Sequence, residues 1–478
     1  MDNQSSYDSM MGLMASEETR AVDTRTAMSP TDRDMPAPVG ASETTTLEKG
    51  PARVWATRLV VAGIVLSAVN LRPAITSLGA LLEEVRDGLG MSGSVAGLLT
   101  SVPPLCFAVF GVMAPRLARR FGPAAVVCAG MAAIFTGLLI RPYAGGTAGF
   151  LAASALALMG IAVSNVLMPV IVKRWFPDRV GSMTGLYSMV LALGTSLPAA
   201  VTVPLTHALG GNWKLGLAVW AVLAAAAVVP WIPLVREGRE RSVPAARSAQ
   251  AQAPAAAAAP AKGQAPAPTP ASVSARAAEE QPPLRITRSR TAWAPAVFFG
   301  LQATAAYITM GWMPQIFRDA GVSAGTAGLL LAVTMVMGVP LAFVIPRIAT
   351  RLPHQGPIVL VLGVCGLAGY AGLYLAPAAG AWAWALLLGI ANCAFPLALT
   401  MVGMRARSGP GVAQLSAFAQ STGYLISIPG PLLVGVLYQH SGGWGLPIAL
   451  MAALMVPQMV VGVLAGRDRT VEEEAAAR

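Results

Sequence analysis

The chain has 478 residues, of which 55% are hydrophobic and only 12% are charged, and its mean hydropathy is +0.62. A soluble protein this apolar would have too little polar surface to cover itself, so the composition predicts a protein that crosses a membrane several times. The net charge of +11 does not indicate nucleic-acid binding, because the basic residues lie in short loops between apolar segments. There they orient a membrane protein and contact anionic lipid headgroups.

The N-terminal segment, residues 1–57, contains scattered acidic residues, Ser, Thr, Pro and Met without periodicity. No basic segment leads into an apolar core there, so we do not expect a cleaved signal peptide. We expect a disordered tail on the cytoplasmic side.

Twelve apolar runs of membrane-spanning length follow, six on each side of a linker. The linker, residues 236–290, is rich in Ala, Pro and Gln and cannot form a core, so we expect a disordered cytoplasmic segment. The expected parts are therefore a six-helix bundle at 58–235, a second at 291–466 and a short C-terminal tail at 467–478. The runs are approximately Arg58–Leu82, Ser94–Ala114, Pro123–Ile140, Thr147–Val172, Gly181–Thr206, Leu215–Val235, Ala292–Phe317, Gly325–Ile345, Gly356–Leu375, Ala381–Gly403, Gly411–Leu437 and Gly445–Ala465.

Loop charges predict the orientation of the chain. Nineteen Lys and Arg residues fall in connections on the side of the N-terminus, and four fall in connections on the other side. Because Lys and Arg concentrate in cytoplasmic loops, we expect both termini in the cytoplasm. The four external residues are Arg86, Arg141, Lys214 and Arg318.

The two halves of the sequence repeat. Gly90–Arg120 aligns without a gap with Gly321–Arg351, so that Ala96-Gly97-Leu98-Leu99 matches Ala327-Gly328-Leu329-Leu330. The copies have the same orientation because six helices separate them. The expected fold is therefore an all-α membrane protein of the major facilitator type, with 12 transmembrane helices in two pseudo-symmetric six-helix bundles. Such proteins rock one half against the other about a site at the membrane midplane.

The first apolar run contains a fixed positive charge in Asn70-Leu71-Arg72-Pro73-Ala74. At about 1.5 Å per residue, Arg72 lies roughly 21 Å from Arg58, past the midplane. A charge at that depth costs roughly 2.5–3.5 kcal/mol on insertion scales, so intramembrane ionisable residues are usually functional. Pro73 removes a backbone donor and loosens the helix beside the guanidinium. We expect Arg72 to face a substrate. There are two structural alternatives. Arg72 could donate hydrogen bonds to carbonyls freed by Pro73, or it could form a latch, that is an ion pair, to Glu83, Glu84 or Asp87.

The loop after the second run resembles the signature loop of the major facilitators, with Pro115-Arg116 where an acidic residue is usual. The resemblance implies that its arginines brace helix ends in one conformation, whereas the alternative is that they only set topology. The candidate residues for this conformational or topological role are Arg116, Arg119, Arg120, Lys173 and Arg174.

Further motifs narrow the resemblance. Asn70-Leu71-Arg72-Pro73, Gly300-Leu301-Gln302 and Trp312-Met313-Pro314 resemble the cyanate/2-nitroimidazole transporter (CynX/NimT) family, as do later motifs up to Phe418–Tyr424. The resemblance spans Arg58 to Gly466 without the linker. It implies a multipass inner-membrane transporter of small anions or small heteroaromatic compounds.

Several polar side chains are candidates to share a substrate cavity with Arg72. Residues four apart lie on one face of a helix, as Gln420 and Tyr424 do, whereas Gln302 and Tyr307 are five apart on another helix. The alternative for each is an interhelical hydrogen bond, worth about 0.6 kcal/mol on average. We expect that structural role for Asn165 and Asn392. The candidate substrate-binding residues are Arg72, Asn70, Gln302, Tyr307, Gln420 and Tyr424.

No sequence pattern indicates an enzyme or a cofactor. A Walker loop, a metal-ligand cluster, HExxH and a Ser/His/Asp arrangement are missing, which excludes an ATP-driven pump within this chain. The four cysteines fall inside apolar runs without paired spacing and are expected to be buried hydrophobes: Cys106, Cys128, Cys365 and Cys393.

The expected function is transport of a small anionic or electron-rich planar solute, similar to cyanate, by alternating access about Arg72. One alternative is an exporter of heteroaromatic toxicants such as nitroimidazoles, and another is a membrane receptor or scaffold that transports nothing. We expect a monomer in a bacterial inner membrane, with the lipid bilayer and the solute as partners and without nucleic acid, metal or cofactor.

Overall fold

The computed structural model describes residues 51–236 and 286–477. Most of the expected N-terminal tail and of the expected linker therefore lies outside the described residues. In the described ranges every regular element is a helix. The prediction of an all-α membrane fold is confirmed.

Ten of the described helices are long and apolar enough to cross a membrane. The two other expected runs are also helical. One is α13 (Arg290–Asp319), which is 30 residues long and carries several polar side chains. The other consists of two short helices, α9 (Trp213–Ala218) and α10 (Trp220–Val228). The other helices of the first half are α2 (Pro51–Asn70), α3 (Pro73–Ala80), α4 (Leu82–Leu89), α5 (Gly93–Phe121), α6 (Pro123–Ile140), α7 (Thr147–Trp175) and α8 (Val180–Ala208). Those of the second half are α14 (Ala324–Val336), α15 (Gly338–Ala349), α16 (Gly356–Leu375), α17 (Ala381–Asn392), α18 (Ala394–Met404), α19 (Gly409–Ser427), α20 (Pro429–Ser441) and α21 (Gly445–Ala465).

The repeat in the sequence has a matching local structure. Gly90 and Gly321 occupy equivalent positions, and both have a positive φ, of 60° and 89°, which favours glycine. Two residues later, Ser92 and Ser323 cap α5 and α14, each accepting a hydrogen bond of 3.3 Å from a backbone N–H three residues on. The same turn and cap therefore begin the second span of each half.

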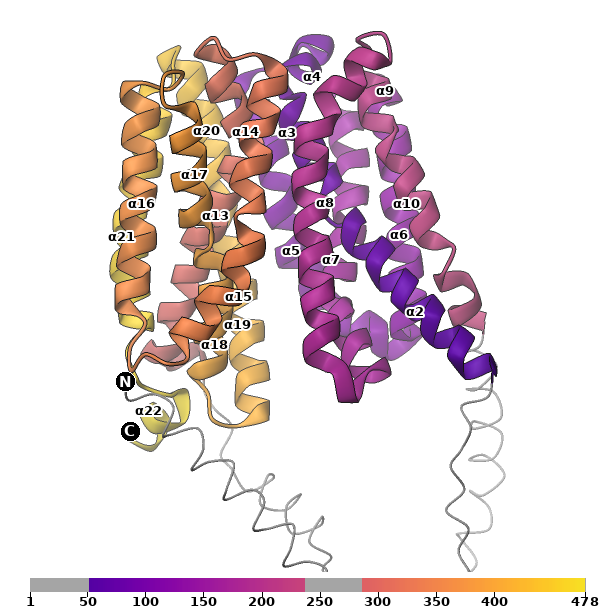
Figure 1. Ribbon diagram of the computed structural model, residues 1–478, viewed down its shortest axis with the longest axis vertical. Coiled ribbons are helices and arrows are strands. Elements are labelled where there is room, and N and C mark those ends of the chain that lie inside the picture. Colours follow the sequence, from indigo (N-terminus) through magenta and orange to yellow (C-terminus); the bar gives the residue numbers. More distant parts are fainter. Residues whose placement is uncertain (1–50, 237–285, 478) are drawn as a thin grey trace, which may run out of the picture. The chain divides into compact units, whose positions relative to one another are not determined.

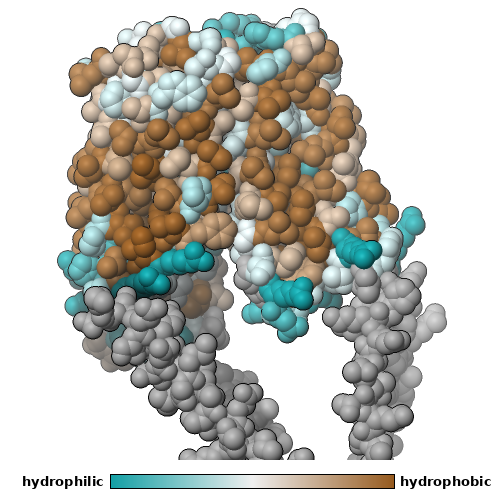
Figure 2. All heavy atoms as spheres, in the orientation of Figure 1, coloured by the Kyte–Doolittle hydropathy of each residue, from teal (hydrophilic) through white to brown (hydrophobic). Residues whose placement is uncertain are grey.

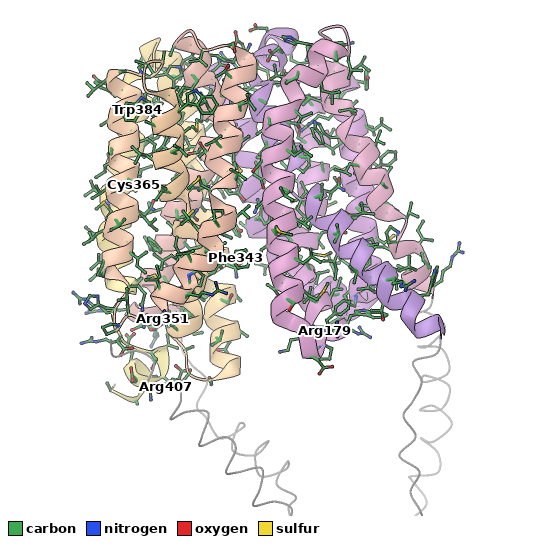
Figure 3. The ribbon with its side chains drawn as sticks, viewed as in Figure 1. Arg179, Phe343, Arg351, Cys365, Trp384 and Arg407 are labelled. Atoms are coloured by element: carbon green, nitrogen blue, oxygen red, sulfur yellow. The ribbon has the colours of Figure 1, made fainter. Side chains whose placement is uncertain are left out.

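The described helices belong to one structural unit, in which helices of the two halves pack directly on each other. α8 packs against α14, and α5 packs against α19 and α20. Figure 1 shows the helices of the two halves close together at the end that holds α4, and the space-filling view shows a cleft between them at the opposite end (Figure 2). Arg179, Arg351 and Arg407 lie at that opposite end (Figure 3), which we call the basic end; we call the other the α4 end.

The outer surface between the two ends is apolar. Large hydrophobic side chains point outward along the spans, for example Val222 at 69% exposure and Val361 at 61%. Figure 2 shows them as a brown band between the more polar ends. Such a band is stable against lipid tails but not against water.

The C-terminal tail folds into one more helix, α22 (Val471–Ala476), where the sequence indicated only a tail. Thr470 and Glu473 form a capping box at its start. Glu474 accepts hydrogen bonds at the start of α13, and Glu472 accepts them from Ser408 at the start of α19. α22 therefore connects two helix N-termini of the second half.

Candidate substrate-binding cavity

The first membrane span is interrupted at Arg72. α2 ends at Asn70 and α3 begins at Pro73, and Arg72 between them has a φ of −128° and a ψ of −26°. Pro73 suits the first position of α3 because a helix has no partner for that backbone N–H. The carbonyl of Arg72 accepts the first hydrogen bonds of α3, from the N–H groups of Ile75 (3.0 Å) and Thr76 (3.2 Å). The break therefore holds the guanidinium between two half-helices, as in transporters whose discontinuous helices form binding sites.

Arg72 lines a cavity of about 390 Å³ between the two halves. Eight polar residues on its wall come from both halves: Arg72, Ser188, Thr195, Gln302, Tyr307, Asn392, Thr400 and Tyr424. The rest of the wall is mostly apolar and includes Met310 and Phe395. Such a mixed wall, apolar with a few polar groups, is typical of sites for small molecules.

The polar groups of the cavity are arranged around the guanidinium. The Tyr307 hydroxyl lies within hydrogen-bonding range of Arg72, and Tyr187 and Tyr424 are close enough to interact with its charge. The Tyr424 ring stacks on Phe107 of the first half, with centroids 5.0 Å apart. Two aromatic rings from opposite halves therefore meet beside the charge.

Arg72 makes no ion pair with a carboxylate within the described ranges. The latch to Glu83, Glu84 or Asp87 that the sequence left open is not formed. Glu83 and Glu84 pair with Arg318, and none of the ion pairs among the described residues joins Arg72 to Asp87. No Asp or Glu of the described chain lines the cavity. The charge of Arg72 is therefore available to a solute.

Gln302 carries a second unused polar group. Its side chain is only 2% exposed, and its Oε1 atom has no hydrogen-bond partner among the described residues. A buried amide oxygen without a partner costs free energy. A bound solute with a donor, or a water, would remove that cost.

Two of the predicted substrate-binding residues are not on the cavity wall. Asn70 donates from Nδ2 to the carbonyls of Leu66 (2.8 Å) and Leu223 (3.0 Å), and so ties α2 to α10. Gln420 donates to Ser416 Oγ (2.8 Å) within its own helix. The structure therefore brings Arg72, Gln302, Tyr307 and Tyr424 together and leaves Asn70 and Gln420 in packing contacts.

Several wall residues were missed from the sequence. Asn392 lines the cavity and also makes the expected interhelical bond, because its Nδ2 atom donates to Sδ of Met335 in α14 (4.0 Å). Asn165 makes its expected interhelical bond by accepting from Tyr187 (2.7 Å). Ser188 and Thr195 are seven residues apart, so they share one face of α8. That spacing was visible in the sequence, but only the packing of α8 shows which of its faces meets the cavity.

The five predicted loop residues lie away from the cavity. Arg116, Arg119 and Arg120 are exposed near the end of α5, and Lys173 and Arg174 are exposed in the last turn of α7. Arg120 packs on the Phe121 ring, with its guanidinium carbon 5.2 Å from the ring centroid. Their role in conformation or topology stays a prediction.

The cavity is closed toward the α4 end by polar contacts between the halves. Arg318 of α13 pairs with Glu83 (2.7 Å) and Glu84 (2.9 Å) of α4. Ser94 of α5 bonds Gln439 of α20, with distances of 2.9 Å from its N–H and 2.7 Å from its hydroxyl. The cleft at the basic end is therefore the open side in this conformation (Figure 2).

A family model described as the Major Facilitator Superfamily matches residues 64–409. The chain belongs to this superfamily. The uncharacterized transporter YycB of Bacillus subtilis is 32% identical over 86% of this chain and 94% of its own length. The 2-nitroimidazole transporter of Escherichia coli is 30% identical over 86% and 96%, and the cyanate transport protein CynX of Escherichia coli is 28% identical over 83% and 94%.

Solved structures of the superfamily have the same fold. The nucleoside transporter NupG has a TM-score of 0.61 at 13% identity and covers 85% of this chain and 98% of its own. The inward-open xylose transporter XylE from E. coli has a TM-score of 0.62 at 12% identity, with coverage of 89% and 99%. The resemblance to the CynX/NimT family is confirmed, and the chain is a multi-pass membrane transporter of the superfamily rather than an enzyme.

Proposed function

We propose that the chain moves a small anionic or electron-rich planar solute across a bacterial inner membrane by alternating access to the Arg72 cavity. One observation carries the proposal: a permanent cation without a carboxylate partner among the described residues lies on the wall of a cavity between the two halves. A guanidinium does not titrate in the physiological range and binds planar oxygen or nitrogen acceptors through two parallel hydrogen bonds.

In this proposal the remaining polar groups orient the solute. Tyr307 and Gln302 contribute a hydroxyl and an amide from the second half, and Tyr424 contributes a ring against which a planar solute can stack. Because Arg72 belongs to the first half and the other three to the second, one bound solute contacts both. Binding of the solute then favours the conformations in which the two halves are close together. Because the solute neutralises the Arg72 charge, the two halves can move relative to each other around it.

The proposed orientation places the basic end in the cytoplasm, with both termini. Its support is the concentration of Lys and Arg in the connections at that end. With this orientation the conformation described here is open to the cytoplasm and closed to the outside.

Cyanate and 2-nitroimidazole define the proposed solute class, because two relatives are named as transporters of these compounds. Cyanate is a small anion, and 2-nitroimidazole is a planar ring with a polar nitro group. The apolar wall and the aromatic rings Phe395 and Tyr424 favour the ring compound as a second candidate.

The test is transport by the purified full chain in proteoliposomes, with labelled cyanate and 2-nitroimidazole as probes. Loss of a charge-assisted hydrogen bond predicts that Arg72→Ala lowers flux of the transported probe about tenfold to a hundredfold. We expect Arg72→Lys to restore part of it, since it keeps the charge without the planar fork. Arg351→Ala, which removes an exposed arginine at the basic end, is the matched control and should leave flux unchanged. Unchanged flux in Arg72→Ala would overturn the proposal.

A further inference from the structure

Arg141 is a second arginine inside the bundle. We counted it as an external loop charge from the sequence, but the structure buries it to 1% exposure at the end of the third span. Its Nη1 atom donates to the carbonyl of Ala74 (2.9 Å), and its guanidinium carbon lies 5.6 Å from the centroid of the Phe150 ring. The third span, α6, therefore ends on a charge that is directed into the protein.

Most of the hydrogen-bonding capacity of Arg141 is unused. Its Nε and Nη2 atoms are buried without a partner among the described residues. None of the ion pairs in the described part of the chain includes it. A buried charge without a counter-charge is strongly unfavourable, by several kcal/mol per ion in proteins after relaxation. Such a group needs an anion.

A small cavity lies beside Arg141, with a volume of about 20 Å³. Ser154 also lines it, and its Oγ atom is buried at 1% residue exposure without a partner in the described ranges. Ser154 follows Phe150 by one helical turn, so both lie on the face of α7 beneath the guanidinium. The unused donors of two elements therefore adjoin one small cavity.

The volume limits the occupant to one particle. A cavity that holds a single water has a volume of at least about 10–15 Å³. The cavity of 20 Å³ beside Arg141 therefore admits a water or a monatomic ion and excludes a carboxylate or a ring. A water would accept hydrogen bonds but leave the positive charge uncompensated. We propose that this cavity binds a halide ion, chloride under cellular conditions, held by Arg141 and Ser154.

The site also lies at the seam between the halves. Tyr307 and Gly311 of α13 complete a wall that is otherwise made by the first half, and Tyr307 lines the Arg72 cavity as well. Separation of the halves at the α4 end would remove the α13 wall. Chloride would therefore bind the conformation described here more tightly and would stabilise it against opening at the α4 end.

The decisive experiment is crystallisation of the full chain in bromide in place of chloride, with data collected at the bromine absorption edge. The proposal predicts an anomalous peak in contact with the Arg141 guanidinium and Ser154 Oγ. A bromide-soaked structure with no peak there, or with a water in that place, would overturn it.

Binding in solution provides an independent test that does not depend on transport. The purified full chain in gluconate buffer should bind ³⁶Cl⁻ saturably at one site per chain, with competition by bromide but not by sulfate, which is too large. Ser154→Ala should weaken binding about tenfold, as expected for loss of one hydrogen bond to a charged group. Arg141→Gln should abolish it, and Arg351→Gln is the control. If the folded wild type, Ser154→Ala and Arg141→Gln bind chloride equally, the proposal is contradicted. If Arg141→Gln does not fold, the comparison of Ser154→Ala with wild type decides.

Discussion

Arg318 of the second half holds two carboxylates of the first: its Nε atom lies 2.7 Å from Oε2 of Glu83, and its Nη1 atom lies 2.9 Å from Oε2 of Glu84. The three side chains are partly buried, with the Arg318 side chain 17% exposed. Gln315, one turn earlier in α13, also donates to Glu83 (3.3 Å). This cluster joins α13 to α4 only while the two halves are closed at the α4 end.

We expect Arg318→Gln to shift the protein toward the conformation that is open at the α4 end. Loss of a partly exposed ion pair costs about 1 kcal/mol, which corresponds to a roughly fivefold change in the ratio of two states. Spin labels at the exposed positions 214 and 446, in a background without the four native cysteines, should report longer distances in the variant. Arg351→Gln at the basic end serves as the control. An unchanged distance distribution would show that the cluster does not set the closed state.

A second prediction concerns the close approach of α5 and α20. A Cβ atom at Gly435 would lie 2.3 Å from the carbonyl oxygen of Gly93 and 2.8 Å from the Cα of Gly97. Because backbone cannot move aside locally, Gly435→Ala should force the helices apart and destabilise this conformation by about 1–3 kcal/mol. Thermal unfolding of the detergent-solubilised protein measures the effect. Gly403→Ala, which meets no atom within 4 Å, should be tolerated, and equal unfolding temperatures for both variants would contradict the prediction.

The third prediction concerns the pH dependence of the contact between α22 and α13. Partial burial raises the pKa of Glu474, but hydrogen bonds from Ser289, Thr291 and Arg290 outweigh this and lower the pKa from 4.5 to about 2. The folded pKa lies below the unfolded one, so the carboxylate stabilises the fold above about pH 4.5, and this contribution is lost as the pH falls from 4.5 toward 2.

Glu474→Gln should therefore lower stability by about 1 kcal/mol at pH 7, a value that allows for solvent screening of a partly exposed group. The difference between wild type and variant should shrink as the pH is lowered from 5 to 3, as followed by the midpoint of thermal unfolding. Asp178→Asn, an exposed acid at the same end, should show no such trend. A difference that stays constant down to pH 3 would mean that the Glu474 carboxylate does not act as described.

The fourth prediction concerns closure of the cleft at the basic end. Phe343 of α15 is 44% exposed and points toward α8, where a Cβ atom at Gly185 would lie 3.7 Å from its Cε1 (Figure 3). In this conformation an alanine at Gly185 fits at ordinary contact distance, whereas a leucine would occupy the space that Phe343 needs when the halves approach.

Gly185→Leu should therefore block closure while it leaves the solute site intact. We expect solute binding, measured by thermal shift with the transported probe, to be unchanged, and flux to fall at least tenfold. Gly185→Ala is the size-matched control and should keep most of the flux. Normal transport by Gly185→Leu would show that closure does not bring α8 and α15 closer together than they are in this conformation.

The sequence by itself determined the helical spans and the repeat, and it indicated a loosened helix beside Arg72. These depend on local properties: apolar runs of sufficient length, equivalent turns at Gly90 and Gly321, and the missing N–H of Pro73. A guanidinium in an apolar run is costly wherever the neighbouring helices lie, so Arg72 could be singled out without them.

Only the tertiary structure decided which polar residues share the cavity and which charges pair. Asn70 is two residues from Arg72, yet it bonds α10, and Arg141 next to a loop lies inside the bundle. The direction of a side chain depends on how each helix is rotated and on which helix packs beside it. That rotation follows from contacts between segments hundreds of residues apart, such as Arg318 with Glu83, which no local pattern contains.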